Sequence, residues 1–388
     1  MAVNTAGIYI HIPFCFAKCT YCSFVSVPKD GRMQAYVDAL CTEIERSAHA
    51  WQGAQVQSVF IGGGTPSVLP PQAIGRILQT VGASYTLADQ AEITCEANPE
   101  SFDAARADAW ARAGVSRISF GVQALQPEML KRLGRPHTFA DFEKAVRTAR
   151  QAGITNLNGD LIYALPGQDM GQWIDSLQAV ADTGVQHVSC YALQVEEGTP
   201  LFDRVQRGAL TLCDEDTAAD MWDAAALVLG QYGLTRYEIS NYARPGYESW
   251  HNQQYWRNGA YAGFGVAAHG AQYRGGQWMR MANTESIDGY IAAVRRGESP
   301  RAWEQTIGKE EEMFETVMLQ TRMVRGLDKA AFHQRFGCAF DDVYPRAIAR
   351  AVDLEMAENS ASYFALNDCG MALQNGVLQW FLSEATGE

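Results

Sequence analysis

The sequence has no long apolar run and no export signal. None of its hydrophobic stretches approaches the roughly 20 residues that a membrane-spanning helix needs. Its first residues, MAVNTAG, lack the charged and apolar segments of a secretory signal peptide. The nine cysteines therefore point to a reducing compartment rather than to a disulfide framework. We expect a cytoplasmic protein.

Basic residues are also scarce. The 388 residues include 31 Lys and Arg against 44 Asp and Glu, which gives a formal net charge of −13. A nucleic-acid-binding protein needs a basic face that neutralises phosphates, so this balance argues against such a partner. With 47% hydrophobic and 19% charged residues, the chain otherwise has the composition of an ordinary globular protein.

Three closely spaced cysteines stand near the start of the chain. Cys15, Cys19 and Cys22 lie in GIYIHIPFCFAKCTYCSF, directly after a short apolar segment. Zinc sites usually combine two cysteine pairs, and no second pair exists here. Buried, unreactive cysteines are the other alternative, but these pack on apolar faces rather than between Lys18 and Thr20.

Three thiolates on one tight loop are typical of an iron–sulfur site. A [4Fe–4S] cluster has four irons and normally takes four cysteine ligands. The loop offers three, and the position two beyond Cys22 is Phe24. One iron would then lack a protein ligand and be free to bind a reacting molecule. We therefore predict a [4Fe–4S] cluster with Cys15, Cys19 and Cys22 as its metal ligands.

Apolar, β-branched segments alternate with helical ones through the first half of the chain. Their spacing of about 30–35 residues predicts right-handed βαβ units and a parallel sheet. Six units rather than eight predict an α/β fold, a partial (β/α)6 TIM-like barrel open on one side. The predicted strands are 7–12, 56–61, 92–98, 117–123, 156–165 and 187–194, and the predicted helices are 33–44, 101–113, 139–152, 171–183 and 214–232.

After residue 270 the pattern changes. A hairpin turning at Gly275-Gly276 leads to predicted helices near 308–324, 328–336 and 341–357, then a strand at 362–366 and a final helix. We expect a core over 1–285 and a small, mostly helical α+β domain over 300–388.

Polar residues and glycines follow the predicted strands. The carboxyl ends of parallel strands carry the chemistry in such folds. GGGTPS at 62–67 offers bare backbone to a ligand, although it lacks the Lys-Ser/Thr ending of a phosphate loop. Alone it is equally consistent with a tight turn. Beside the cysteines it predicts a cradle for a small molecule's amino or carboxylate group.

A second unusual motif is HNQQYW at 251–256. Histidine is a common haem-iron ligand, and Tyr255 and Trp256 could stack on a porphyrin face. An aromatic plug at the open edge of the barrel explains the same residues equally well. No Cys-X-X-Cys-His and no Cys-Pro pair occurs, so a thioether-attached haem is not indicated.

Together these motifs resemble the radical S-adenosylmethionine superfamily, and specifically its coproporphyrinogen-oxidase-like branch. Residues 308–388 resemble the small C-terminal domain of that branch. The other matching segments are YIHIPFCFAKCTYCSF at 9–24, IGGGTPS at 61–67, EITCEANPE at 92–100, RISFGVQ at 117–123, RLGRPH at 132–137, NGDLIYALPGQ at 158–168, YEISNYARPGY at 237–247, HNQQYW at 251–256 and GVAAHG at 265–270.

The resemblance implies a second cofactor on the unliganded iron. S-adenosylmethionine would chelate that iron, and an electron from the cluster would cleave the sulfonium to a 5′-deoxyadenosyl radical. The residues implied to hold S-adenosylmethionine are Tyr9, Gly62, Gly63, Gly64, Thr65 and Glu96. Those that match a second S-adenosylmethionine site in the true oxidases are Tyr21, Gln123, Arg135 and Asp160.

Two features favour a haem-chaperone branch. The oxidases carry a further cysteine where this chain has Phe24, and HNxxYW belongs to the chaperones. The resemblance thus implies binding of haem, with His251, Tyr255 and Trp256 as the candidates, and its delivery to apo-haemoproteins such as respiratory cytochromes. It allows a transient membrane-associated partner. A radical oxidase that decarboxylates porphyrinogen propionates and a radical methyltransferase are the alternative functions.

Two positions depart from the family pattern. Ala124 stands where serine usually follows GVQ, and Ala164 stands where glycine is common before LPG. Neither change removes a cluster ligand or a haem candidate, so the resemblance is unaffected.

Overall fold

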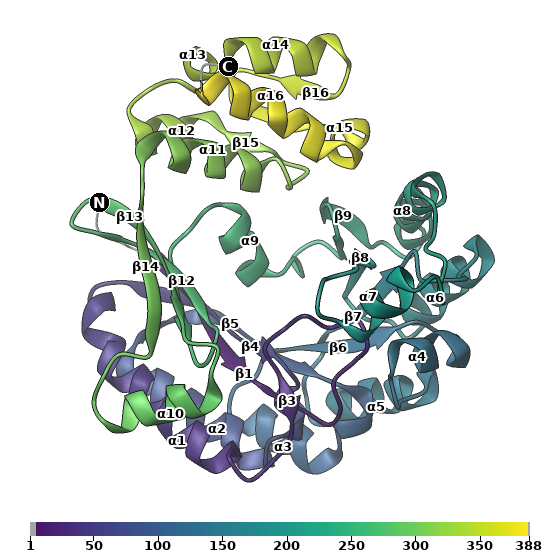
Figure 1. Cartoon of the computed structure of the whole chain (residues 1–388), viewed down its shortest axis with the longest axis vertical. Helices are drawn as coiled ribbons and strands as arrows, with labels where there is room; N and C mark the ends of the chain where they lie inside the picture. The colour runs from purple at the N-terminus through teal and green to yellow at the C-terminus, as the bar shows by residue number, and fades with distance from the viewer. Residues whose placement is uncertain (1–4, 387–388) are drawn as a thin grey trace.

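Six parallel strands form the centre of the molecule (Figure 1). They lie side by side in chain order, and every neighbouring pair is parallel. The computed structural model, which describes residues 5–386, therefore confirms the predicted partial barrel. The strands are β1 (Thr5–Ile12), β4 (Gln55–Gly63), β5 (Thr86–Ala97), β6 (Arg117–Gln123), β7 (Asn156–Tyr163) and β8 (His187–Ala192).

The central strands are buried on both faces, which explains their nearly continuous apolar sequences. In β6 only Gly121 is not fully buried. The same strand also carries Ser119 and Gln123, whose polar side chains are buried as well. Polar groups inside a strand of this kind need partners there, and they supply part of the site described below.

Helices cover the outside of the barrel, most of them where the sequence predicts. α1 (Met33–Ser47) buries the expected stripe from Tyr36 to Ile44. α2 (Pro71–Ser84) is absent from the predicted elements, because Gly75 and Gly82 interrupt its pattern and weaken its helix propensity. Two short helices, α4 (Pro127–Leu133) and α7 (Pro200–Gln206), are also absent from the predicted elements. The remaining helices of the barrel are α3 (Ala104–Arg112), α5 (Phe139–Gln151), α6 (Met170–Asp182) and α8 (Glu215–Gly230).

Further strands extend the sheet at both edges, to twelve strands within the described residues. β11 (Tyr261–Phe264) pairs parallel to β1, and three antiparallel strands continue from it. The hairpin turning at Gly275-Gly276 is confirmed. The edge strands are β12 (His269–Arg274), β13 (Gln277–Asn283) and β14 (Arg301–Ile307) on one side, with α10 (Ile287–Arg295) before β14, and β10 (Asn241–Ala243) and β9 (Thr235–Glu238) on the other.

The chain leaves the large sheet at the end of β14. We therefore propose that the domain boundary lies at Gly308, beyond the expected region 285–300. The helix predicted over 341–357 is wrong, because Pro345 begins a new helix there. The C-terminal domain contains α11 (Lys309–Gln320), β15 (Leu327–Asp328), α12 (Lys329–Phe336), α13 (Phe340–Val343), α14 (Pro345–Asp353), β16 (Ala357–Asn359), β17 (Tyr363–Leu366), α15 (Asp368–Ala372) and α16 (Gln374–Thr386).

The two parts of the chain are joined by several polar contacts. Arg335 of α12 donates a hydrogen bond to the carbonyl of Asn258 at 2.7 Å. Arg236 of β9 pairs with Asp368 at 2.9 Å, and Glu238 forms a β-bridge with Met323. The short helix α9 (Trp250–Trp256) lies between the large sheet and the C-terminal domain (Figure 1).

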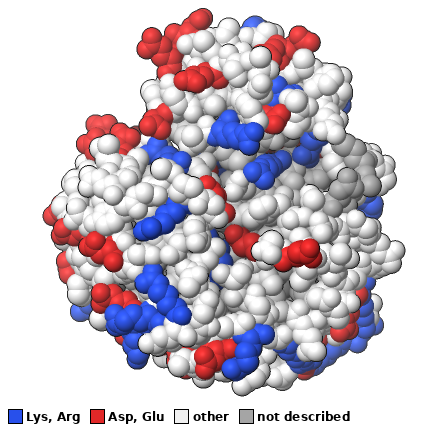
Figure 2. Space-filling model, turned by 180° about the vertical axis from the view of Figure 1, so that it is seen from behind, with Lys and Arg blue, Asp and Glu red and all other residues white. Residues whose placement is uncertain are grey.

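Two surface properties complete the description. On the face in Figure 2, Lys and Arg side chains are interspersed with Asp and Glu and form no continuous basic area. Over residues 5–386, none of the helices combines the length and the apolar character that crossing a membrane requires.

Candidate functional site

The three cysteines lie on a closed and anchored loop at the carboxyl end of β1. β2 (Phe14–Cys15) pairs with β3 (Val27–Pro28) and closes the loop at its base. At its tip, the Thr20 N–H donates to the carbonyl of Leu133 at 3.1 Å, which fixes the loop to the end of α4. Cys15 is buried, and Cys19 and Cys22 are half-buried.

The electrostatics of this loop suit a metal cluster. Burial raises the pKa of the Cys19 and Cys22 thiols, and the neighbouring cysteines raise it further. A bound cation is what would hold such thiols as thiolates. No group of three or more His, Cys, Asp or Glu side chains in residues 5–386 converges on a single ion. Three free thiols on one short loop match the donor set of a cluster with three cysteine ligands.

The three glycines at the carboxyl end of β4 pack directly against the ends of the neighbouring strands. The Gly63 N–H, at a φ of 101°, donates to the Glu96 carboxylate at 3.1 Å. A Cβ on Gly62 would lie only 2.7 Å from the same carboxylate, and the Gly64 N–H bonds the carbonyl of Ile12 at 2.8 Å. The segment therefore forms the tight turn that was one of the two interpretations of GGGTPS. It brings bare backbone beside Glu96.

Two carboxyl groups approach each other, Glu96 near the end of β5 and Asp160 within β7. Burial, together with the nearby charge of Asp160, raises the pKa of Glu96 to about 8. Asp160 accepts hydrogen bonds from Ser119 at 2.8 Å and Asn158 at 2.7 Å, and burial raises its pKa too. A cationic ligand group beside these two side chains would favour their ionised forms.

A chain of hydrogen bonds links the cysteine loop to the strand ends. Arg135 donates to the Tyr21 hydroxyl and to the Asn98 amide oxygen, both at 2.8 Å. Asn98 in turn donates to Thr65 at 3.2 Å. Asn98 is not among the residues predicted to hold a cofactor, although it ends the predicted strand 92–98, where polar residues are expected to form the rim of the site.

Two buried polar atoms in this region have no hydrogen-bond partner in the described chain. They are Nε of Arg135 and Oε1 of Gln123. Gln123 also has a φ of 62°, which is unusual for a residue with a side chain. An unpartnered acceptor at the end of β6 and an unpartnered donor just after α4 fit a site completed by a polar ligand.

Aromatic rings connect the top of the barrel interior with the HNQQYW helix. The Tyr9 hydroxyl bonds Nδ1 of His11 at 3.0 Å, and its ring stacks on Phe60 with centroids 6.3 Å apart. Phe60 stacks on His251 with centroids 5.2 Å apart. The structure thus places Tyr9 near the other predicted S-adenosylmethionine residues and His251 deeper in the barrel.

Both ring nitrogens of His251 are engaged within the protein. Nδ1 bonds Ser58 at 2.7 Å and Nε2 bonds the Tyr255 hydroxyl at 2.8 Å. The side chain is 1% exposed, and burial lowers its pKa to about 3. In this conformation His251 is neutral and has no free nitrogen for an iron.

Trp256, at the other end of the motif, lies at the domain interface. It is half-buried, and the guanidinium of Arg322 lies over its ring, 4.4 Å from the centroid. The three haem candidates therefore do not share one surface. His251 and Tyr255 belong to the barrel interior, and Trp256 faces the C-terminal domain.

Comparisons with known proteins match both parts of the chain. The family described as "Radical SAM superfamily" matches residues 9–180, and "HemN C-terminal domain" matches residues 307–373. "Heme chaperone HemW" of Lactococcus lactis is 34% identical over 375 residues, which are 96% of this chain and 96% of that protein. The protein of the same name from Escherichia coli is 35% identical, over 97% of this chain and 98% of its own length.

A solved structure supports the fold over the whole length. Coproporphyrinogen III oxidase (HemN) from Escherichia coli superimposes with a TM-score of 0.82. The match covers 98% of this chain and 90% of that protein, at 22% sequence identity. The similarity extends through the C-terminal domain as well as the barrel.

Proposed function

The chain belongs to the family of the heme chaperone HemW within the radical SAM superfamily, and from this membership we propose that it binds haem and delivers it to acceptor haemoproteins. One observation carries the proposal. The HNQQYW motif forms an ordered helix between barrel and C-terminal domain. Phe24, which stands where the oxidases have a further cysteine, agrees with it. The acceptors we propose are apo-cytochromes of the respiratory chain, loaded from the cytoplasm.

The cofactor site is proposed from the residues that meet at the strand ends. Cys15, Cys19 and Cys22 would hold the [4Fe–4S] cluster, which supplies an electron to S-adenosylmethionine when both are bound. The bare backbone of the glycines, the buried Glu96 carboxyl group and the Tyr9 ring support the proposal that S-adenosylmethionine binds here. The residues proposed to hold it are Tyr9, Gly62, Gly63, Gly64, Thr65 and Glu96.

A second polar group is proposed near the tip of the cysteine loop. Arg135 donates a hydrogen bond to the Tyr21 hydroxyl. Nε of Arg135 and Oε1 of Gln123 have no hydrogen-bond partner in the described residues. A carboxylate would pair with Arg135, and an ammonium group would lie near Gln123 and Asp160. We propose that these four side chains orient a second S-adenosylmethionine.

The haem contact is proposed to involve His251, Tyr255 and Trp256 in different ways. Trp256 reaches the domain interface, where its ring would hold the Arg322 guanidinium beside the macrocycle. His251 would coordinate iron only after giving up its bond to Ser58 or to Tyr255. If H251A bound haem with wild-type affinity and an unchanged spectrum, the ligand role of His251 would be lost.

Delivery is tested by mixing haem-loaded, cluster-reconstituted protein with an apo-cytochrome under anaerobic conditions. We expect the acceptor spectrum to appear faster than it does with the same concentration of free haem. Transfer no faster than from free haem would remove the chaperone role.

A further inference from the structure

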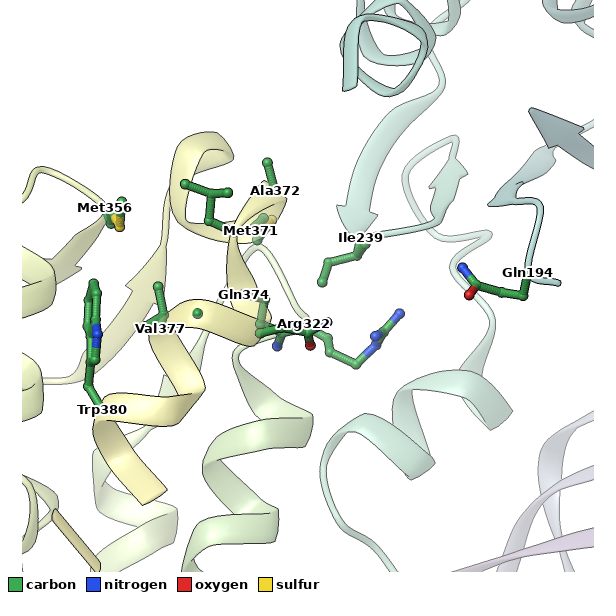
Figure 3. Close-up of a pocket in the computed structure, with 12 residues that line it drawn as sticks. Gln194, Ile239, Arg322, Met356, Met371, Ala372, Gln374, Val377 and Trp380 are labelled. Atoms are coloured by element: carbon green, nitrogen blue, oxygen red, sulfur yellow. The ribbon is translucent and has the colours of Figure 1, made fainter. Parts of the chain in front are cut away.

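A cavity of ≈ 550 Å³ lies between the barrel and the C-terminal domain (Figure 3). Gln194 and Ile239 line it from the barrel side, and Met371 and Trp380 line it from the C-terminal domain. Its volume is within the range of small-molecule sites, roughly 300–1,000 Å³. None of the residues proposed for the cluster or for S-adenosylmethionine lines it, so it is a separate site.

The lining selects one kind of ligand. Arg322 is the single charged residue among the described residues that line the cavity. The other walls are apolar side chains, amides, and the methionines Met356 and Met371. An apolar body with an anionic edge would satisfy such a lining.

Arg322 is placed to bind an anion. Its side chain is 27% exposed, and one end of its guanidinium, Nη2, pairs with the buried carboxylate of Glu238 at 3.5 Å. The backbone holds it firmly, because the Ile239 N–H donates to its carbonyl at 3.1 Å. In Figure 3 its side chain extends across the cavity toward Gln194.

Arg322 also connects this cavity to the HNQQYW motif. Its guanidinium stacks over Trp256, the residue with which the motif ends. The side chain therefore has the cavity on one side and the motif on the other. A ligand bound to Arg322 would lie next to the part of the motif that reaches the domain interface.

We propose that this cavity binds the haem macrocycle, with the exposed part of the Arg322 guanidinium pairing a haem propionate. Met356, Met371 and Trp380 pack against the porphyrin ring, and Gln194 closes the barrel side. The inference rests on the proposed function, since it names where the transported haem is held. It assigns the C-terminal domain one wall of the haem site.

The test compares haem with haem dimethyl ester, which lacks the propionate charges. Both are titrated anaerobically into cluster-reconstituted wild type, R322Q and the matched control R325Q, an exposed arginine on the same turn, and followed by Soret absorbance. We expect R322Q to bind haem about tenfold or more weakly, because a charge-assisted pair is lost. It should bind the dimethyl ester as wild type does, and R325Q should bind both normally.

A second variant tests the cavity independently, in case R322Q does not fold. Ala372 lines the cavity and is exposed, so A372W should fill the space without disturbing the core. We expect A372W to bind neither haem nor its ester. A361W, on an exposed turn outside the lining, should bind both.

The outcomes separate the two proposals. Normal haem binding by both R322Q and A372W would overturn the cavity assignment and leave the chaperone role standing. Failure of the wild type to bind haem would overturn the proposed function itself. An equal loss of haem and ester affinity in R322Q, without loss in A372W, would also contradict the cavity site.

Discussion

At the scale of single residues, His251 determines how the HNQQYW region responds to acid. Its pKa is about 3 in the folded protein because it is buried, and about 6.5 in an unfolded chain. Between these values the unfolded state binds more protons than the folded state. Stability attributable to this residue is therefore complete above about pH 6.5 and falls as the pH drops toward 3.

We predict that H251Q removes this dependence. From pH 7 to pH 5 the wild type should lose about 2 kcal/mol more unfolding free energy than the variant, by the linkage between pKa and stability. Urea unfolding of both proteins at both pH values measures the difference. His187, whose pKa burial also lowers, contributes equally to both proteins and cancels. Equal losses would show that His251 is not held neutral.

Ala164 is a second residue with a consequence for stability. Its φ is 58°, a conformation in which a Cβ is unfavourable and glycine is not. We predict that A164G raises the unfolding free energy by about 0.5–1 kcal/mol. The control A219G, at an exposed position inside α8, should lower it by a similar amount. Destabilisation by A164G would mean that this φ carries no strain.

At the scale of elements, the position of α9 depends on one carboxylate from a strand. Glu92 of β5 accepts hydrogen bonds from the backbone N–H groups of Trp250 and His251, at 3.1 and 3.2 Å. Ser249 caps the same end of the helix. Negative charge at a helix N-terminus stabilises it, so Glu92 holds the motif against the sheet.

We predict that E92Q lowers the unfolding free energy by about 1 kcal/mol, because one acceptor and the charge are lost. D89N, an exposed position on the same strand, should change it by less than about 0.5 kcal/mol. Chemical denaturation measures both. If the two variants behaved alike, the docking of α9 would not rest on this contact.

The same elements show what a sequence pattern can and cannot predict. β6 has the predicted bounds because it is buried on both faces and reads as an uninterrupted strand. β5 begins at Thr86, earlier than predicted. The pattern did not reveal its first residues, because they are partly exposed and polar. α2 was missed because two glycines lie inside it.

At the scale of the whole molecule, Arg335 joins the C-terminal domain to the loop after α9. It donates to the Asn258 carbonyl and pairs with Glu312 at 2.7 Å, and its side chain is 17% exposed. Removing one partner of a largely buried ion pair leaves the other without compensation. The contact therefore couples the domain that forms one wall of the proposed haem site to the barrel.

We predict that R335A lowers the unfolding free energy by about 2–3 kcal/mol, below the range for a fully buried pair because of its exposure. It should also speed proteolysis near residue 308. R346A removes an arginine that is 74% exposed, although its partner Glu384 is largely buried, and should cost less than about 1 kcal/mol. Unchanged stability and proteolysis in R335A would show that the domains are held elsewhere.

The sequence could predict those site residues that lie near the carboxyl ends of the parallel strands, because the sheet brings these ends to one edge. Cys19 follows β1 and Glu96 lies near the end of β5, where polar residues were expected to collect, and Asp160 lies within β7. The contact between Trp256 and Arg322 was not predictable, because it joins two domains and depends on how they pack. The engagement of both His251 nitrogens likewise appears only in three dimensions.

The most direct test of the account is an anaerobic haem titration of the cluster-reconstituted protein, with coproporphyrinogen consumption measured in the same samples. If the protein is a haem chaperone, it should bind one haem per chain. It should leave coproporphyrinogen unchanged in the presence of S-adenosylmethionine. Consumption of coproporphyrinogen without stable haem binding would contradict it and restore the oxidase function.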